Sequence, residues 1–368
     1  MPFSQPSISK EEISLVGEVL MSGWLAHGEY NEKFELAFSE YTGANHSLSL
    51  NSCTSALELA LWINNIKGEV LIPSFTWSST GNVVLLQGGK PVFVDIEPDT
   101  FNISLADAES KITARTEAII IVHYAGLCAD LEGFRALSYK YGLLLVEDSA
   151  EALGASQNNI NAGQGGYGCF SFYPTKNITT CEGGMLTFKN ERDFLHAKAL
   201  AAHGVQKAAI DRETGVGKEK WYREAIYNGR NFRMPNPLAA LGYLQLQRNT
   251  EFNLRRNEIA QRYNKIIDEK EYFQRQKIDE GMCHSFQMYS FLSPDKTKHI
   301  EFLNQHGIMA SSHFDPPLHR QTAFIDQSAK SVRLSATEKV AEEVITLPLY
   351  PSMSEEQISY VEHYLNLL

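Results

Sequence analysis

Cysteine is scarce in this sequence, and its spacing argues against two kinds of structural framework. The 368 residues contain five cysteines, an odd number, and none of them forms a C-x-x-C pair. We therefore expect neither a disulfide framework nor a structural zinc site, and no metal at the functional site. Such cysteine usage fits a reducing compartment, which predicts a cytoplasmic protein.

Long apolar runs and long runs of one charge are also lacking. No apolar window approaches the roughly 18 residues that a membrane-spanning helix needs. Residues 1–12 do not combine a basic stretch with an apolar run, so we expect no secretory signal. The formal net charge of −11 is spread along the chain. A surface of this kind matches neither nucleic acid nor an anionic membrane, and we expect neither as a partner.

What the chain does have is the composition of a globular protein, with 43% hydrophobic and 21% charged residues. Short apolar segments alternate with helical patterns in its first half. We predict strands at 47–50, 69–73, 91–96, 118–124 and 143–148, with helices at 54–64, 77–87 and 130–142. This alternation predicts an α/β fold with a mainly parallel sheet covered by helices, whose ligands bind beyond the carboxyl ends of the strands.

The two ends of the chain have helical patterns of a different kind. Residues 10–21 place Ile13, Val16 and Leu20 on one helical face, behind a capping box of Ser9 and Glu12. The pattern changes near residue 245, where a long charged helix is predicted. A strand at 284–292, a helix end at 301–307 and a terminal helix at 355–368 follow. We therefore predict a large domain over 1–245 and a smaller α+β domain over 246–368.

Lys176 lies in a tight loop between two predicted buried strands, with Gly183 and Gly184 just before the second. Desolvation near a sheet edge favours the neutral, nucleophilic amine of a lysine. A lone loop lysine is more often simply solvated.

Asp148 ends another strand and could face the same crevice, where a carboxylate can keep a pyridinium nitrogen protonated. Alternatively, Asp148 could cap a following helix.

Other segments add weaker signals. Small and hydroxyl residues open the helix in 51–61, which makes a generic phosphate seat or an ordinary helix cap. Trp77 follows a strand and could lie on an aromatic ring or in the core. Residues 229–242 place polar side chains before the start of a helix of small residues.

Together these segments resemble the sugar aminotransferases of the DegT/DnrJ/EryC1/StrS family, within the aspartate-aminotransferase superfold. The resemblance covers nearly the whole chain. Its most specific stretches are IPSFTW (72–77), KPVFVDIEPDTFNI (90–103), VHYAG (122–126), VEDSAEALGA (146–155), FSFYPTKNITTCEGG (170–184) and NFRMPNPLAALGYLQL (231–246). It implies a large pyridoxal-phosphate-binding domain and a smaller C-terminal domain.

The resemblance also implies roles for individual residues. Lys176 would hold pyridoxal 5'-phosphate as a Schiff base and move the proton between cofactor and substrate. Asp148 would pair with the pyridine nitrogen. The remaining implied contacts are a stacking Trp77, phosphate ligands at Thr54, Ser55 and Ser171, an Asn231 that reaches the phosphate of the neighbouring subunit, and a His319 beside the sugar.

One position departs from the family pattern. Members usually carry Gln or His three residues after the aspartate, near the phenolic oxygen of the cofactor, and this chain has Glu151. A carboxylate beside a phenolate is unfavourable unless it is protonated or turned away. We hypothesise that Glu151 is protonated there and donates a hydrogen bond. The alternative is a solvated glutamate on a helix that begins at Ser149.

By this resemblance the chain is a transaminase for amino-sugar biosynthesis, of the kind that supplies lipopolysaccharide O-antigens, and a homodimer with shared active sites. The donor would be an amino acid, glutamate in most of the family, and the acceptor a nucleotide-linked keto-deoxy sugar. The segment SGWLAHG (22–28) favours amination at C4. Amination at C3 and inosose amination remain alternatives. A dehydratase is disfavoured because that branch replaces the lysine with histidine. A non-catalytic regulator would have no need for Lys176, Asp148 and Trp77 together.

Overall fold

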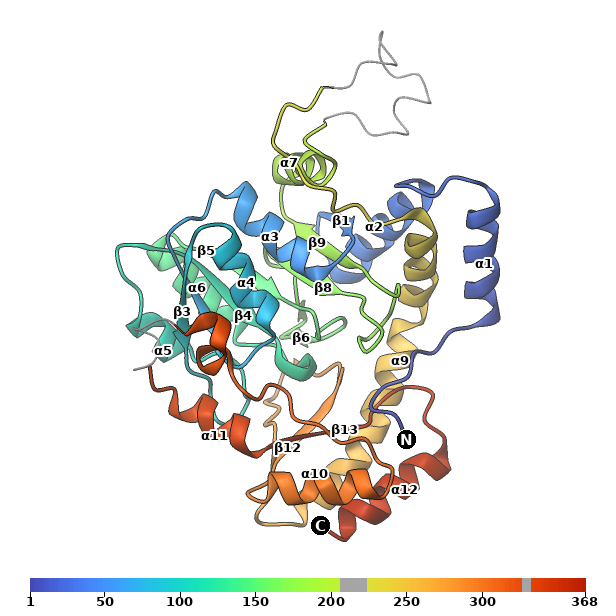
Figure 1. Ribbon diagram of the computed structural model, residues 1–368, viewed down its shortest axis with the longest axis vertical. Coiled ribbons are helices and arrows are strands. Elements are labelled where there is room, and N and C mark those ends of the chain that lie inside the picture. The colour runs from blue at the N-terminus through green and yellow to red at the C-terminus, as the bar shows by residue number, and fades with distance from the viewer. Residues whose placement is uncertain (206–223, 326–331) are drawn as a thin grey trace.

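The central feature of the chain is a seven-stranded sheet (Figure 1). The computed structural model describes residues 1–205, 224–325 and 332–368. The strand order is β1-β9-β8-β5-β4-β2-β3. β9 runs antiparallel to both neighbours, and every other neighbouring pair is parallel. The strands are β1 His46–Leu50, β2 Glu69–Pro73, β3 Lys90–Val94, β4 Thr116–Val122, β5 Leu144–Asp148, β8 Tyr167–Ser171 and β9 Gly184–Phe188. The predicted α/β fold with a mainly parallel sheet is confirmed.

Both faces of this sheet are buried, as the continuous apolar runs of its strands require. In β2, Val70 and Ile72 belong to one apolar cluster with α3, whereas Leu71 belongs to another with α6. The helices around the sheet are α2 Glu29–Thr42, α3 Cys53–Ile63, α4 Ser78–Leu86, α5 Leu105–Ser110, α6 Leu131–Tyr141 and α7 Glu191–Ala201, and α1 Lys10–Met21 packs on α9 (Asn236–Asp268).

The long helix α9, Asn236–Asp268, leads from the sheet into the rest of the chain (Figure 1). There, β10 Gln274–Arg275, β12 Tyr289–Leu292 and β13 Val344–Leu347 form an antiparallel sheet beside α10 Lys296–Gln305, α11 Ser335–Glu343 and α12 Glu355–Asn366. A further small sheet joins β6 Ser156–Gln157, β7 Ile160–Asn161 and β11 Met282–Cys283. Short 3-10 turns lie at Tyr124–Gly126, Leu318–Arg320 and Thr322–Phe324. The proposed domain boundary at residue 245 falls inside α9.

α1 has the predicted bounds, and the apolar face predicted from its periodicity is largely exposed. Ile13 is 62% exposed and Leu20 is 53% exposed, while Glu12 is buried and pairs with Arg248 of α9 at 2.8 Å. Burying a carboxylate is tolerated here because the guanidinium neutralises it and its Oε2 accepts a second hydrogen bond, of 2.7 Å, from the backbone N–H of Ser9 in the capping box. The apolar stripe of α1 therefore faces away from the chain's own core.

The carboxyl ends of the parallel strands meet at one edge of the sheet. β1, β2, β4, β5 and β8 point the same way, so the segments that follow them converge there. In the part of the chain that the structure describes, no helix combines the length and apolar character needed to cross a membrane.

Candidate active site

A cavity of about 480 Å³ opens at this edge. Its lining combines charged groups, hydroxyls and aromatic rings from segments that are far apart in the sequence. They include Phe3, Ser52, Cys53, Thr54, Thr76, Trp77, Ser79, Asp148, Glu151, Ser171, Tyr173, Lys176, Glu182, Gln287, Met288, His313 and Phe314. The volume lies within the range that holds a cofactor-sized ligand.

Lys176 and Glu151 form an ion pair inside the cavity. Lys176 Nζ lies 3.1 Å from Glu151 Oε1, and Glu151 Oε2 accepts a hydrogen bond of 2.8 Å from the backbone N–H of Ala125. Ala125 has a φ of 57°, so its N–H is presented by a backbone in the left-handed region. Both oxygens of Glu151 thus accept hydrogen bonds, which is the pattern of a carboxylate. The hypothesis that Glu151 is protonated beside a bound cofactor stays a prediction.

Asp148 ends β5 and is buried at the floor of the cavity. Its Oδ2 accepts a hydrogen bond of 2.9 Å from Thr80 Oγ1, and its Oδ1 accepts one of 3.3 Å from the N–H of Ala150. Burial raises the pKa of Asp148 above its ordinary value, and these hydrogen bonds oppose that shift. Residues 149–155 are turns rather than a helix, so neither the helix-cap alternative for Asp148 nor the solvated-helix alternative for Glu151 describes the structure.

The first turn of α3 faces the cavity through Ser52, Cys53 and Thr54. Ser52 caps the helix, with its side chain accepting a hydrogen bond from the N–H of Ser55 at 3.1 Å. N–H groups in a first turn have no carbonyl partner within the helix, so they can bind an anion. The start of α3 packs closely against residue 184, and only glycine fits there, because a Cβ at Gly184 would lie 2.4 Å from the Ser52 carbonyl carbon.

Two of the three phosphate ligands predicted from the sequence line the cavity, namely Thr54 and Ser171. Ser55 does not line it, and its hydroxyl instead donates a hydrogen bond of 2.7 Å to Asn51 Oδ1. Trp77 lines the cavity with 64% of its surface exposed, its ring 6.3 Å from that of Phe314. Asn231 is exposed outside the cavity, where its Oδ1 accepts a hydrogen bond from Arg233.

His319 does not reach the cavity. Its Nδ1 lies 2.6 Å from Ser74 Oγ and its Nε2 lies 3.0 Å from Glu338 Oε1, so both ring nitrogens are engaged in a buried position. Its role at a sugar site stays a prediction. The histidine that does line the cavity is His313, whose Nδ1 lies 2.8 Å from Thr346 Oγ1. Burial lowers the pKa of His313, which favours its neutral form.

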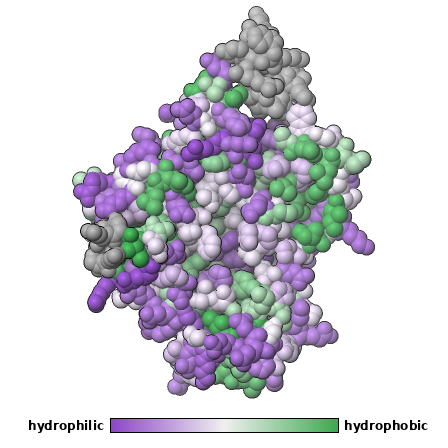
Figure 2. Space-filling view, in the orientation of Figure 1, coloured by the Kyte–Doolittle hydropathy of each residue, from purple (hydrophilic) through white to green (hydrophobic). Residues whose placement is uncertain are grey.

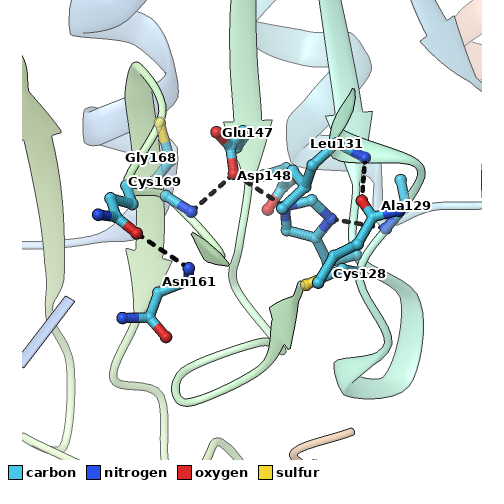
Figure 3. Close-up of polar contacts among 12 residues, drawn as sticks. Cys128, Ala129, Leu131, Glu147, Asp148, Asn161, Gly168 and Cys169 are labelled. Atoms are coloured by element: carbon cyan, nitrogen blue, oxygen red, sulfur yellow. Dashed lines mark hydrogen bonds and ion pairs between the residues drawn. The ribbon is translucent and has the colours of Figure 1, made fainter. Parts of the chain in front are cut away.

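Glu147 and His123 form a second buried pair, next to the cavity but not lining it. Glu147 precedes Asp148 on β5 and accepts hydrogen bonds from His123 Nε2 at 3.1 Å and the N–H of Gly163 at 2.6 Å (Figure 3). Burial raises the pKa of Glu147, but these hydrogen bonds outweigh it and hold the pKa below its ordinary value. His123 Nδ1 accepts from the N–H of Ala129, so its Nε2 carries the proton. The pair anchors the turn that presents Ala125, and the sequence had given no sign of it.

The lining residues fit pyridoxal phosphate. The α3 N-terminus with Thr54 and Ser171 suits the phosphate, buried Asp148 suits a pyridinium nitrogen, and Lys176 supplies the amine. Thr80 and His313 were not singled out from the sequence. Thr80 lies three residues after Trp77 in a serine- and threonine-rich stretch, and His313 lies six residues before His319.

Comparison with known proteins agrees with this geometry. The sequence model of the DegT/DnrJ/EryC1/StrS aminotransferase family matches residues 6–366. The chain belongs to this family. It is therefore a pyridoxal-phosphate-dependent aminotransferase, and the family assignment implies a sugar substrate and an amino donor.

Three relatives illustrate the similarity. The spore coat polysaccharide biosynthesis protein SpsC of Bacillus subtilis is 34% identical, over 98% of this chain and 95% of its own length. PseC of Helicobacter pylori, an aminotransferase involved in pseudoaminic acid biosynthesis, is 29% identical with a TM-score of 0.91, over 99% of this chain and 97% of its own. Spr1654 of Streptococcus pneumoniae, described as a sugar aminotransferase in its PMP form, is 28% identical with a TM-score of 0.92, over 100% and 98%.

Proposed function

We propose that this aminotransferase moves an amino group from an amino acid, glutamate, to a nucleotide-linked keto-deoxy sugar, at C4. The observation that carries the proposal is the cavity in which Lys176, Asp148 and the first turn of α3 meet. The segment SGWLAHG (22–28) favours amination at C4. Similarity to PseC, an aminotransferase of pseudoaminic acid biosynthesis, supports a sugar acceptor. Amination at C3 and inosose amination are the nearest alternatives. Lys176 and the aminotransferase family together disfavour a dehydratase or a silent regulator.

We assign the lining residues the following parts in this reaction. When bound, pyridoxal phosphate supplies the carbonyl that takes up the amino group and the ring that accepts electrons from the substrate carbon. Lys176 Nζ would take a proton from that carbon as general base and deliver it, as general acid, to the cofactor carbon that bears the amino group. Asp148 holds a positive charge at the ring nitrogen, and Thr80 holds Asp148. Trp77, which lines the cavity and is largely exposed, would stack on the ring.

The substrate is tested by a screen of nucleotide-linked 3-keto and 4-keto sugars with glutamate, read by mass spectrometry. A product in which an amino group replaces the keto oxygen at C4 is the expected result. Amination only of 3-keto sugars or of an inosose would replace the C4 assignment. No amination of any sugar would remove the proposed substrate class.

We further propose that the chain acts in the cytoplasm as a homodimer with shared active sites. Apolar side chains gather on the face over α1 and α2 (Figure 2). Exposed members on these helices are Ile13, Leu20, Met21 and Leu36. A contiguous exposed apolar surface of this kind is typical of an interface. We propose that a second copy of this chain covers this apolar face. Asn231 is exposed and lies outside the cavity of its own subunit, so in such a dimer it could reach the cavity of the partner.

Mixed dimers test the shared site. Asn231→Ala and Lys176→Ala subunits should each be defective alone, but a heterodimer of the two should have one intact site. Isolated heterodimers are therefore expected to recover about half of the wild-type activity, because one of two sites is complete. Activity is measured on heterodimers purified with two affinity tags. No recovery would mean that both residues serve a site within one subunit.

Glu151 is tested by two substitutions. Glu151→Gln should keep most of the activity, because its amide can accept from Ala125 and donate toward the cofactor's phenolic oxygen. Glu151→Ala leaves the N–H of Ala125 without its acceptor and should lower kcat by about 10²-fold. The measurement is the pH–rate profile of all three proteins. If the Gln variant is as slow as the Ala variant, the charge that pairs with Lys176 is what matters, and the donor hypothesis is wrong.

A further inference from the structure

The N-terminal segment passes beside the cavity in an irregular conformation and is held by hydrogen bonds at Met1 and Ser7. The backbone oxygen of Met1 accepts a hydrogen bond of 3.1 Å from the N–H of Met309. At the other end, the backbone oxygen of Ser7 accepts one of 2.9 Å from Gln245 Nε2, on α9. Figure 1 shows the segment running from beside β13 along α9 to α1. These two attachments fix the residues between them.

Phe3 lies between the two attachments and lines the same cavity as Lys176. Its ring centroid is 5.1 Å from that of His313, with an angle of 30° between the rings. Phe3 is only partly buried and packs against an apolar cluster that contains Met288 and Phe314, both of which also line the cavity. Phe3 thus extends this cluster into the cavity as part of an apolar wall.

This wall is not needed to match the polar groups of the cofactor. The charged and hydrogen-bonding atoms of pyridoxal phosphate are matched by Asp148, Lys176 and the hydroxyl-rich first turn of α3, which are polar. A glutamate donor carries two carboxylates and gains little from contact with aromatic rings. Phe3, Met288 and Phe314 can instead bind an apolar edge of the acceptor sugar. Such an edge makes no hydrogen bonds to water, so it loses none when it is buried.

We propose that Phe3 is a specificity-determining residue that receives the deoxygenated edge of the acceptor sugar. The inference rests on the proposed function. A hydroxyl on that edge would be buried against Phe3 and Phe314 without a partner, so a hydroxylated sugar binds less well than its deoxy counterpart. Discrimination of this type is worth about 10- to 100-fold in an apolar pocket.

The test separates the two half-reactions. The donor half is the reaction of glutamate with the pyridoxal-phosphate enzyme, followed by absorbance. The acceptor half uses a nucleotide-linked 4-keto-6-deoxyhexose and its 6-hydroxy analogue with the pyridoxamine-phosphate enzyme. In Phe3→Ala, KM for the deoxy sugar should rise about 10-fold and the preference for it should fall below about 3-fold, with the donor half within about 2-fold of wild type. Calorimetry of the deoxy sugar nucleotide on cofactor-free protein should show the same loss of affinity.

Phe302→Ala is the matched control. Phe302 is also a partly buried phenylalanine packed on a histidine, with its ring 4.6 Å from that of His306, but it lies in α10 and not in the cavity lining. It should change neither half-reaction. Phe3→Tyr keeps the ring and should retain the preference if Phe3→Ala folds poorly. An unchanged preference in Phe3→Ala, or equal losses in both half-reactions, overturns the inference. A wild-type enzyme that aminates no keto sugar instead overturns the proposed function.

Discussion

Lys176→Ala is expected to abolish transamination, with a fall in kcat of at least about 10³-fold, because the variant has neither the amine that holds the cofactor nor the general base. Borohydride should attach the cofactor to the peptide that contains Lys176 in the wild-type protein, which should be yellow when purified. Peptide mass spectrometry after reduction is the measurement. Lys176 is well placed for this role because its Nζ lies in the cavity, 3.1 Å from Glu151.

Two further lysine variants separate charge from chemistry. Lys176→Arg retains a positive partner for Glu151 but cannot form a Schiff base, so it should be as inactive as the Ala variant. Lys189→Ala removes an exposed lysine outside the cavity and should leave activity and labelling unchanged. Reduction that labels another lysine would show that the cofactor attachment has been assigned to the wrong residue.

Asp148→Asn is expected to lower kcat by about 10³-fold and to weaken cofactor binding, because a neutral amide cannot hold the proton on the ring nitrogen. The substitution preserves the shape of the side chain, and its oxygen can still accept from Thr80 or Ala150. Stopped-flow rates and a titration of cofactor-free protein with pyridoxal phosphate measure the two effects. Near wild-type values for both would leave Asp148 with a structural role only.

Glu147→Gln provides a control on the same strand. Glu147 is as deeply buried as Asp148 but does not line the cavity and instead pairs with His123. Replacing the buried carboxylate that His123 Nε2 hydrogen-bonds should lower the free energy of unfolding by about 2 kcal/mol while leaving cofactor affinity within a few-fold of wild type. Thermal and denaturant unfolding of the two variants would distinguish a defect in stability from a defect in cofactor chemistry.

The parallel sheet and its ligand-binding edge were open to prediction from the sequence because the information is local. A strand buried on both faces needs an unbroken apolar run, and 118–124 and 143–148 have one. Chain direction then places the residues that follow each strand at one edge. For this reason Asp148 and Lys176 could be assigned to the same crevice before any distance was known, and the family resemblance supplied their chemistry.

Tertiary structure decided what depends on contacts between distant segments. Helical periodicity in α1 placed Ile13 and Leu20 on one face, but the Glu12–Arg248 pair turned that face outward. Motif position pointed to His319, yet the loop geometry brings His313 into the cavity and leaves His319 between Ser74 and Glu338.

Tertiary structure also decided which groups contact Glu151 and where the N-terminal segment lies. Only packing pairs Glu151 with Ala125 and Lys176, and only the attachments of Met1 and Ser7 bring Phe3 into the wall of the cavity. Local sequence specifies which element forms and which way it runs, because backbone propensity and burial period act over a few residues. It does not specify which side chains meet, because that depends on how the elements pack across hundreds of residues.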